Sequence, residues 1–252
     1  MTLTRAQIEL ALRSARTIQR LYPGGDLTPN IYSSATDTQG LATPRPDGTW
    51  ELNFPGTASR RDMLTDIMVI KKQWGVGYIH WGVRAAVWSI IEQVRDIIPT
   101  GAVVEIGGHS LGGGIAQGVA DTLADSYTIS TVNTFGGLRT FNRAEAESYN
   151  ARVGKVTLRF VNHGDIVPLL PLQLWIPRTG IYWHTDNEVY INAAGQLVTD
   201  RNPLAALPPL VRKLATFISS AATQPNLSAV SQLVDVSPHF ISTYIKRLEA
   251  LA

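Results

Sequence analysis

The apolar residues of this chain change their spacing from one segment to the next. At the start they recur every three to four residues, which predicts an amphipathic helix from about Thr4 to Leu21 that a Pro-Gly-Gly sequence then stops. Thr4 and Gln7 have the pattern of a capping box at its first turn. The same spacing over residues 83–98, followed by a proline, predicts a second helix.

Short apolar runs follow the second helix. Residues 102–108, 128–135 and 155–161 have the length and apolarity of buried strands, and helical patterns separate them over 111–124 and 141–151. The order strand, helix, strand, helix, strand predicts an α/β fold with a mainly parallel central sheet and helices on both faces. A further strand precedes them, marked by the alternating residues Trp50, Leu52 and Phe54.

The composition of the chain fits one large domain. It has 252 residues, of which 44% are hydrophobic and 17% charged, so it can bury a sizeable core and has no disorder signature. No linker-like segment, repeat or low-complexity tract interrupts it. We therefore expect a single domain over residues 1–252.

Charge and cysteine content exclude several kinds of partner. The formal net charge is +2, and the lysines and arginines are scattered, so the basic stripe that nucleic acid requires is missing. The absence of cysteine excludes disulfides and thiolate metal ligands. No apolar run reaches the ~18 residues that a transmembrane helix needs.

The first residues also bear on localisation. Charged residues at Arg5, Glu9, Arg13 and Arg16 interrupt the apolar pattern, so we expect this segment to be a helix of the domain and not a signal peptide. A protein secreted after removal of a leader and a cytoplasmic protein both fit this pattern.

A candidate nucleophile lies where the strand predicted over 102–108 ends. Residues 108–112 (GHSLG) have the form G-x-S-x-G, and a helical pattern begins directly after Ser110. Strand, sharp turn and helix are the context of a nucleophile elbow, whose glycines let strand and helix approach each other. The alternative is a turn that merely needs small residues. We expect His109 to be packed and hydrogen-bonded, because neighbouring side chains on so tight a turn point apart.

A serine nucleophile needs a histidine base and a carboxylate that orients it. In α/β hydrolases the three follow the order serine, acid, histidine. Asp165 lies in the loop after the strand predicted over 155–161, so it is the best placed acid, with an ordinary turn aspartate as the alternative. Two histidines follow it, His184 and His239.

Several motifs occur in a fixed order along the chain and together span about residues 50–251. They are Phe54-Pro55-Gly56-Thr57, residues 62–66 (DMLTD), residues 108–114 (GHSLGGG), Thr134-Phe135-Gly136 and residues 161–171 (VNHGDIVPLLP). This set resembles the class 3 lipases, the family that contains the filamentous-fungal triacylglycerol lipases. Pro55 stands where that family has arginine, and Gly137-Leu138-Arg139 replaces its G-x-P-R, which concerns loop shape rather than chemistry. The resemblance implies an α/β-hydrolase fold.

The resemblance favours His239 as the base. The family's base lies just before an aromatic-rich final helix, which residues 239–244 resemble, whereas its earlier histidine lies in an aromatic strand and is not catalytic. Local chemistry agrees, because Ser237 and Pro238 suit the start of a helix. His184, within an alternating strand over 181–191, is the alternative.

Ester cleavage develops a negative oxygen that needs preorganised N–H donors. Leu111 supplies one as the residue after the nucleophile. By resemblance Thr57 supplies the other, with a turn threonine after Pro-Gly as the alternative reading of the motif.

Three apolar segments allow more than one interpretation. Residues 59–74 fall where the family carries its lid, and a lid that binds a lipid interface or an amphipathic helix packed on the core would both explain their apolar side chains. The leucines over 169–176 could line an acyl groove or belong to the core. Residues 204–222 predict a helix whose purpose the sequence does not give.

These observations predict an enzyme that hydrolyses carboxylic esters, triacylglycerols or other lipid esters, through an acyl-serine intermediate. Ser110, Asp165 and His239 form the expected triad, and Thr57 and Leu111 the oxyanion hole. Neither a metal nor an organic cofactor is implied. A phospholipase, a feruloyl esterase or an acyltransferase could use the same triad, and a lipid-binding module with a dead triad is the non-enzymatic alternative.

Overall fold

The computed structural model describes residues 2–56, 70–171, 180–198 and 237–252. Four predictions fall wholly or mostly elsewhere. Thr57, most of the expected lid over 59–74, the apolar residues 172–176 and the helix expected over 204–222 lie outside the described residues.

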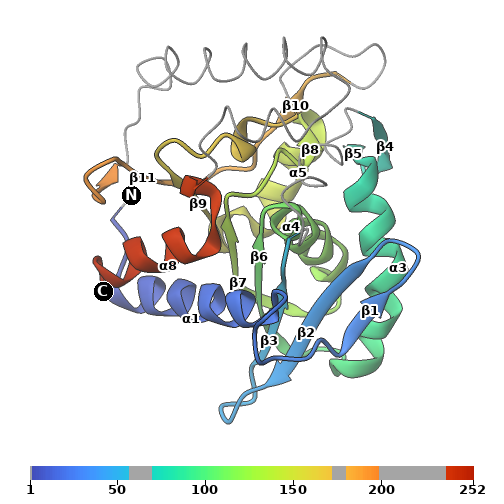
Figure 1. Ribbon diagram of the computed structural model, residues 1–252. Coiled ribbons are helices and arrows are strands. Elements are labelled where there is room, and N and C mark those ends of the chain that lie inside the picture. Colours follow the sequence, from blue (N-terminus) through green and yellow to red (C-terminus); the bar gives the residue numbers. More distant parts are fainter. Residues whose placement is uncertain (1, 57–69, 172–179, 199–236) are drawn as a thin grey trace.

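An eight-stranded sheet forms the centre of the protein (Figure 1). Across the sheet its strands are β1 (Ile31–Ser33), β2 (Thr38–Pro44), β3 (Trp50–Phe54), β6 (Val103–His109), β7 (Thr128–Phe135), β9 (Thr157–Asn162), β11 (Glu188–Ile191) and β12 (Leu197–Val198). The five strands from β3 to β11 run parallel, and the outer ones join antiparallel. The predicted mainly parallel sheet is confirmed.

A smaller, antiparallel sheet contains β10 (Tyr182–Trp183), β8 (Phe141–Asn142), β5 (Gly77–His80) and β4 (Lys71–Trp74), in that order. It corrects two predictions. The segment expected to be a lid cannot extend to Trp74, because residues 71–74 pair with β5 as an edge strand. The single strand expected over 181–191 is wrong as well, because β10 and β11 belong to different sheets. A polar turn with Asn187 at φ 59° separates them.

Helices cover both faces of the central sheet (Figure 1). On one face, α1 (Arg5–Leu21) and α8 (Ile241–Glu249) pack beside each other on a core that includes Phe135 and Phe160. On the other face, α3 (Trp81–Ile97), α4 (Leu111–Leu123) and α5 (Arg143–Val153) enclose the larger core. Because helices pack on both faces of the sheet, the ends of its strands are held in fixed positions.

The helix ends follow local hydrogen bonding. Thr4 and Gln7 form the predicted capping box of α1. The helix expected to start at Phe141 begins at Arg143 instead, because Asn142 closes β8 and caps α5 by accepting from the Glu145 N–H at 3.2 Å.

The start of the terminal helix also differs from the prediction. Residues 237–239 form a 3₁₀ turn (η3), and α8 begins only at Ile241, after the extended Phe240. The carbonyls of Pro238 and His239 accept hydrogen bonds from the side chains of Asn162 and His109, which holds them out of the helical ladder. Two further 3₁₀ turns are η1 (Gly154–Val156) and η2 (Val167–Leu169).

No helix within the described ranges has the length and apolarity to cross a membrane.

Candidate active site

Ser110 lies at the sharp turn between β6 and α4. Its backbone has φ 57° and ψ −123°, a strained conformation that non-glycine residues rarely adopt. Its N–H donates to the Phe135 carbonyl at the end of β7 at 3.0 Å. The turn therefore holds the serine side chain at the carboxyl edge of the parallel strands.

The two glycines of the G-x-S-x-G motif allow this turn to close. A Cβ on Gly108 would lie 2.0 Å from the Gly112 carbonyl oxygen, and one on Gly112 would lie 2.4 Å from the Phe54 carbonyl oxygen. Any larger residue would push the strand and the helix apart. The motif is thus a steric requirement of the close approach of β6, α4 and β3.

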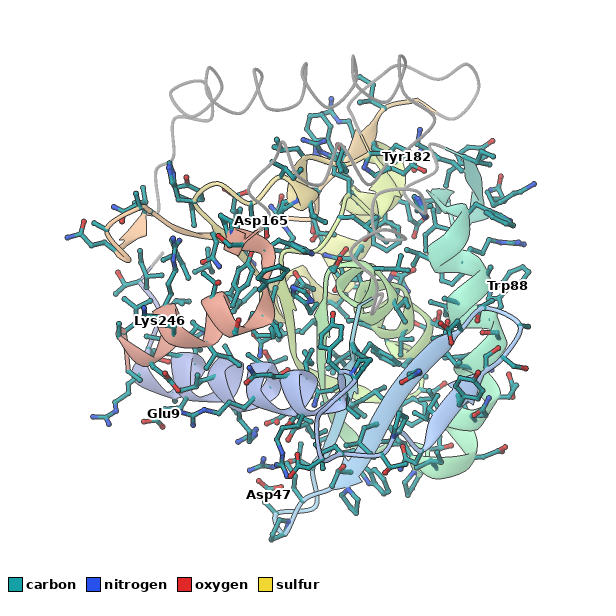
Figure 2. The ribbon with its side chains drawn as sticks, viewed as in Figure 1. Glu9, Asp47, Trp88, Asp165, Tyr182 and Lys246 are labelled. Atoms are coloured by element: carbon teal, nitrogen blue, oxygen red, sulfur yellow. The ribbon has the colours of Figure 1, made fainter. Side chains whose placement is uncertain are left out.

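Asp165 and His239 meet beside this turn, although 74 positions separate them in the sequence. Both carboxylate oxygens of Asp165 lie 3.0 Å from His239 Nδ1, and both side chains are buried. Asp165 comes from the loop after β9, and His239 comes from η3. In Figure 2, Asp165 lies close to the first turn of α8.

Two further donors fix the Asp165 carboxylate. The Val167 N–H donates to Oδ1 at 2.9 Å, and the hydroxyl of Tyr244 on α8 donates to Oδ2 at 2.7 Å. The Tyr244 oxygen in turn accepts from the Asn162 N–H at 3.1 Å. Because burial and the neighbouring Asp165 raise the pKa of Tyr244 well above its ordinary value, its hydroxyl keeps the proton that it donates.

The other ring nitrogen of His239, Nε2, differs from Nδ1 in its surroundings. Nε2 is buried and has no hydrogen-bond partner among the described residues, Ser110 Oγ included. An unpaired buried nitrogen is costly in a structural histidine, whereas catalytic hydrogen bonds are often long until the substrate binds. Asp165 contacts Nδ1, so Nε2 is the nitrogen that can accept a proton.

His109 and His184 have other partners. His109 bonds through Nδ1 to Tyr22 Oη at 2.7 Å and through Nε2 to the His239 carbonyl oxygen at 2.6 Å. Burial, and then the neighbouring His239, lower the pKa of His109 to about 3, so it is neutral. His184 lies in the link between β10 and β11, and its Nε2 lies 2.6 Å from the Pro168 carbonyl oxygen. The structure thus brings His239, and not His184, to Asp165.

Of the two expected oxyanion donors, the structure describes one. Leu111 is the first residue of α4, so its N–H is among the helix donors that have no partner within the helix. The positive end of the helix dipole lies at the same place. Gly56, which precedes Thr57, packs against the elbow, since a Cβ on it would lie 2.8 Å from the Ser110 Cβ.

A pocket of about 310 Å³ adjoins the elbow. Gly56 and Leu111 lie at its border, and its walls come from the end of α1, the β1–β2 hairpin and the start of α3, which contributes Trp81 and Ala85. The residues over 169–171 that could have lined an acyl groove do not line this pocket.

Two site tyrosines carry no motif in the sequence. Tyr244 looks like one more member of the apolar face of the terminal helix, and Tyr22 is the last residue before the Pro-Gly-Gly stop. For Tyr244, the sequence signal is a hydroxyl on an otherwise apolar helix face. A buried tyrosine oxygen needs a hydrogen-bond partner, so the hydroxyl indicates a polar group nearby.

A parallel sheet with a strained serine at a strand–helix elbow, and a carboxylate–imidazole pair on the adjoining loops, defines an α/β-hydrolase-like lipase fold. Residues 52–175 match the family model of lipase (class 3).

Solved lipases share the fold. A Rhizomucor miehei triacylglyceride lipase has 21% identity and a TM-score of 0.63, over 82% of this chain and 92% of that chain. A lipase from Rhizopus microsporus var. chinensis has 24% identity and a TM-score of 0.59, over 76% of each chain. A triacylglycerol lipase whose catalytic centre is a serine protease triad has 21% identity and a TM-score of 0.62, over 82% of this chain and 92% of that chain. At these identities the likeness establishes the fold alone.

Proposed function

We propose that this protein is a class 3 lipase that hydrolyses lipid esters through an acyl-serine intermediate on Ser110. The observation that carries the proposal is the buried Asp165–His239 pair, whose imidazole lies 4.6 Å, between ring centroids, from that of His109, the residue before the strained Ser110. The lipase with a serine protease triad supports the same reading, because it shares this fold.

In the proposed first half-reaction, Ser110 Oγ attacks the ester carbonyl carbon while His239 Nε2 takes the hydroxyl proton. Asp165 orients the imidazole and stabilises the imidazolium. The Leu111 N–H and, by family resemblance, the Thr57 N–H bind the oxyanion. Collapse of the tetrahedral intermediate breaks the bond to the alkoxy oxygen, and His239 returns its proton to the leaving alcohol.

The second half-reaction repeats these roles with water. His239 Nε2 removes a proton from water, whose oxygen attacks the acyl carbon, and the same donors bind the second oxyanion. Breakdown releases the carboxylic acid and restores the Ser110 hydroxyl. No metal or organic cofactor takes part in this scheme.

The pocket supports a lipid acyl chain as the group beside the elbow. Its volume lies at the lower end of the range for small-molecule sites, and apolar side chains such as Leu21 and Ile115 contribute to its wall. We place the acyl chain there, with the carbonyl oxygen at Gly56 and Leu111.

The direct test is hydrolysis of p-nitrophenyl esters by the wild type, Ser110→Ala and Ser14→Ala. Ser14 is a matched control, because it is a buried serine whose hydroxyl donates to Asn53 at 2.6 Å. We expect Ser110→Ala to lower kcat by about 10⁴-fold or more and Ser14→Ala to keep kcat. A folded Ser110→Ala protein with most of its activity would contradict the proposal.

Substrate class is tested with emulsified triacylglycerols, phospholipids and feruloyl esters beside a graded acyl series. We expect triacylglycerols and medium-chain esters to be hydrolysed fastest. Ala85→Phe, which fills the pocket from α3, should shift the optimum to shorter acyl chains. An unchanged optimum would place the acyl chain elsewhere, and dominant transfer to added alcohol would identify an acyltransferase.

A further inference from the structure

Three hydrogen bonds join distant parts of the chain behind the elbow. The Gly56 N–H lies 2.7 Å from Tyr22 Oη, which lies 2.7 Å from His109 Nδ1. Nε2 of the same imidazole lies 2.6 Å from the His239 carbonyl oxygen. These contacts link the end of α1, the segment after β3, the end of β6 and the η3 turn.

Chemistry allows only one direction for the donors. A carbonyl oxygen can only accept, so His109 Nε2 carries the hydrogen. His109 is neutral, because burial lowers its pKa to about 3, and Nδ1 therefore accepts from the Tyr22 hydroxyl. Burial raises the pKa of Tyr22, so the phenol keeps its proton and its oxygen accepts from the Gly56 N–H. Each of the three donors, the Gly56 N–H, the Tyr22 hydroxyl and His109 Nε2–H, therefore has an acceptor.

The two ends of this chain of hydrogen bonds, at Gly56 and at His239, adjoin groups whose relative positions the proposed reaction depends on. Gly56 precedes Thr57, the oxyanion donor that family resemblance implies, and His239 is the proposed base. His109 also precedes Ser110, and its ring centroid lies 4.6 Å from that of His239. A shift of either ring would thus displace nucleophile, base and oxyanion segment together.

We propose that Tyr22 and His109 are positioning residues that hold the oxyanion segment and the base in register with Ser110. This inference rests on the proposed ester hydrolysis. The two residues move no proton in the reaction and act only through the groups they hold. The neutral state of His109 matters here, because a second cation beside the His239 imidazolium would raise the energy of the transition state.

The first test compares Tyr22→Phe with Tyr149→Phe in hydrolysis of a soluble p-nitrophenyl ester. Each change deletes one internally bonded hydroxyl, and Tyr149 on α5 bonds only Thr157 Oγ1, at 2.8 Å, among the described residues. Tyr22→Phe should lower kcat on the order of tenfold and leave KM within about twofold, because one misaligned hydrogen bond is worth about a factor of ten. Tyr149→Phe should leave kcat unchanged at a similar loss in Tm.

The second test removes the two hydrogen bonds of His109 one at a time. In His109→Gln the amide nitrogen can replace Nε2–H, and in His109→Asn the amide oxygen can replace Nδ1. In the Tyr22→Phe background, His109→Gln should add less than about a threefold loss in kcat, because the contact it deletes is already gone. His109→Asn should add its full single-mutant loss there, because it deletes the contact with His239.

The outcomes separate this inference from the proposed function. A wild type that hydrolyses esters, with a folded Tyr22→Phe variant of equal kcat, would overturn the positioning role alone. A rise in KM without a fall in kcat would also overturn it, because Tyr22 lines the pocket and would then act through substrate binding alone. A wild type with no activity on any ester would overturn both proposals.

Discussion

Two aspartates are buried in the part of the chain that the structure describes, Asp121 and Asp165, and their surroundings differ in one decisive respect. Asp121 on α4 forms an ion pair with Arg152 and accepts from Trp74 Nε1 at 2.7 Å. Asp165 has a tyrosine hydroxyl at the same 2.7 Å, but its other side-chain partner is the imidazole of His239 in place of an arginine. Among the described residues, no lysine or arginine forms an ion pair with Asp165.

The difference teaches how to distinguish a structural carboxylate from one that can serve catalysis. A permanent guanidinium already compensates the charge of Asp121, so this cluster can only stabilise the fold. The charge of Asp165 faces a group that becomes cationic only when it takes a proton. In the proposed reaction, its electrostatic stabilisation is therefore greatest in the transition state.

The largest expected effect comes from the histidine of the Asp165 cluster. His239→Ala should lower kcat for ester hydrolysis by about 10⁴-fold or more, matching Ser110→Ala, because members of the proposed triad act as a unit. His184→Ala should keep kcat and lower Tm, since it loses the contact with the Pro168 carbonyl. Steady-state kinetics on a soluble ester measures kcat for both variants, and thermal unfolding measures their Tm. A large loss of kcat in His184→Ala, with kcat kept in His239→Ala, would make His184 the base.

Replacing each aspartate by asparagine tests directly whether Asp165 and Asp121 have different roles. Asp165→Asn should lower kcat by about 10⁴-fold, because an amide cannot stabilise the imidazolium. Asp121→Asn should leave kcat within about twofold but reduce the free energy of unfolding by about 1–3 kcal/mol, since the ion pair with Arg152 is lost. Kinetics and urea denaturation measure the two effects, and a large kcat loss in Asp121→Asn would remove the distinction.

A milder change deletes the neutral donor from each aspartate. Tyr244→Phe removes the hydroxyl from Asp165 and should lower kcat about tenfold, the effect of one hydrogen bond to a charged group. Trp74→Phe removes the indole N–H from Asp121 and should affect only Tm. Equal kcat in both variants would show that the tyrosine has no part in orienting Asp165.

Burial of a neutral His109 beside the Asp165 cluster predicts a pH effect on stability. Its pKa is lowered from 6.5 to about 3 in the folded protein, so the unfolded chain binds the extra proton below pH 6.5. Relative to His109→Gln, the wild type should lose about 1.4 kcal/mol of unfolding free energy per pH unit as pH falls from 6.5 toward 3, the pKa of His109 in the folded protein. Tyr22, Tyr244, Asp165 and His239 face the ring and are present in both proteins.

Urea denaturation of both proteins at several pH values checks this slope. The difference between the two proteins is the informative quantity. Asp121 and Glu145, whose pKa values burial raises, shift stability in the opposite direction in both proteins alike. A difference that stays constant below pH 6.5 would mean that His109 titrates normally.

The strand–helix order and the elbow follow from local patterns, so they could be predicted. Apolar runs set β6 and β7, and Gly108 and Gly112 flank Ser110, whose backbone adopts the strained turn. The antiparallel sheet and the break between β10 and β11 could not be predicted, because they depend on long-range pairing and on a turn at Asn187. Tyr22 was equally inaccessible, since its two partners lie 34 and 87 positions away.

Labelling with a fluorophosphonate tests the central claim most directly, because the reagent phosphonylates only an activated serine. Intact and peptide mass spectrometry should find one label per chain on Ser110, none on Ser110→Ala, and labelling of Asp165→Asn that is slower by orders of magnitude. Asp121→Asn should react at the wild-type rate. A folded wild type that stays unlabelled, or carries its label on another residue, would contradict the assignment of Ser110 as the nucleophile.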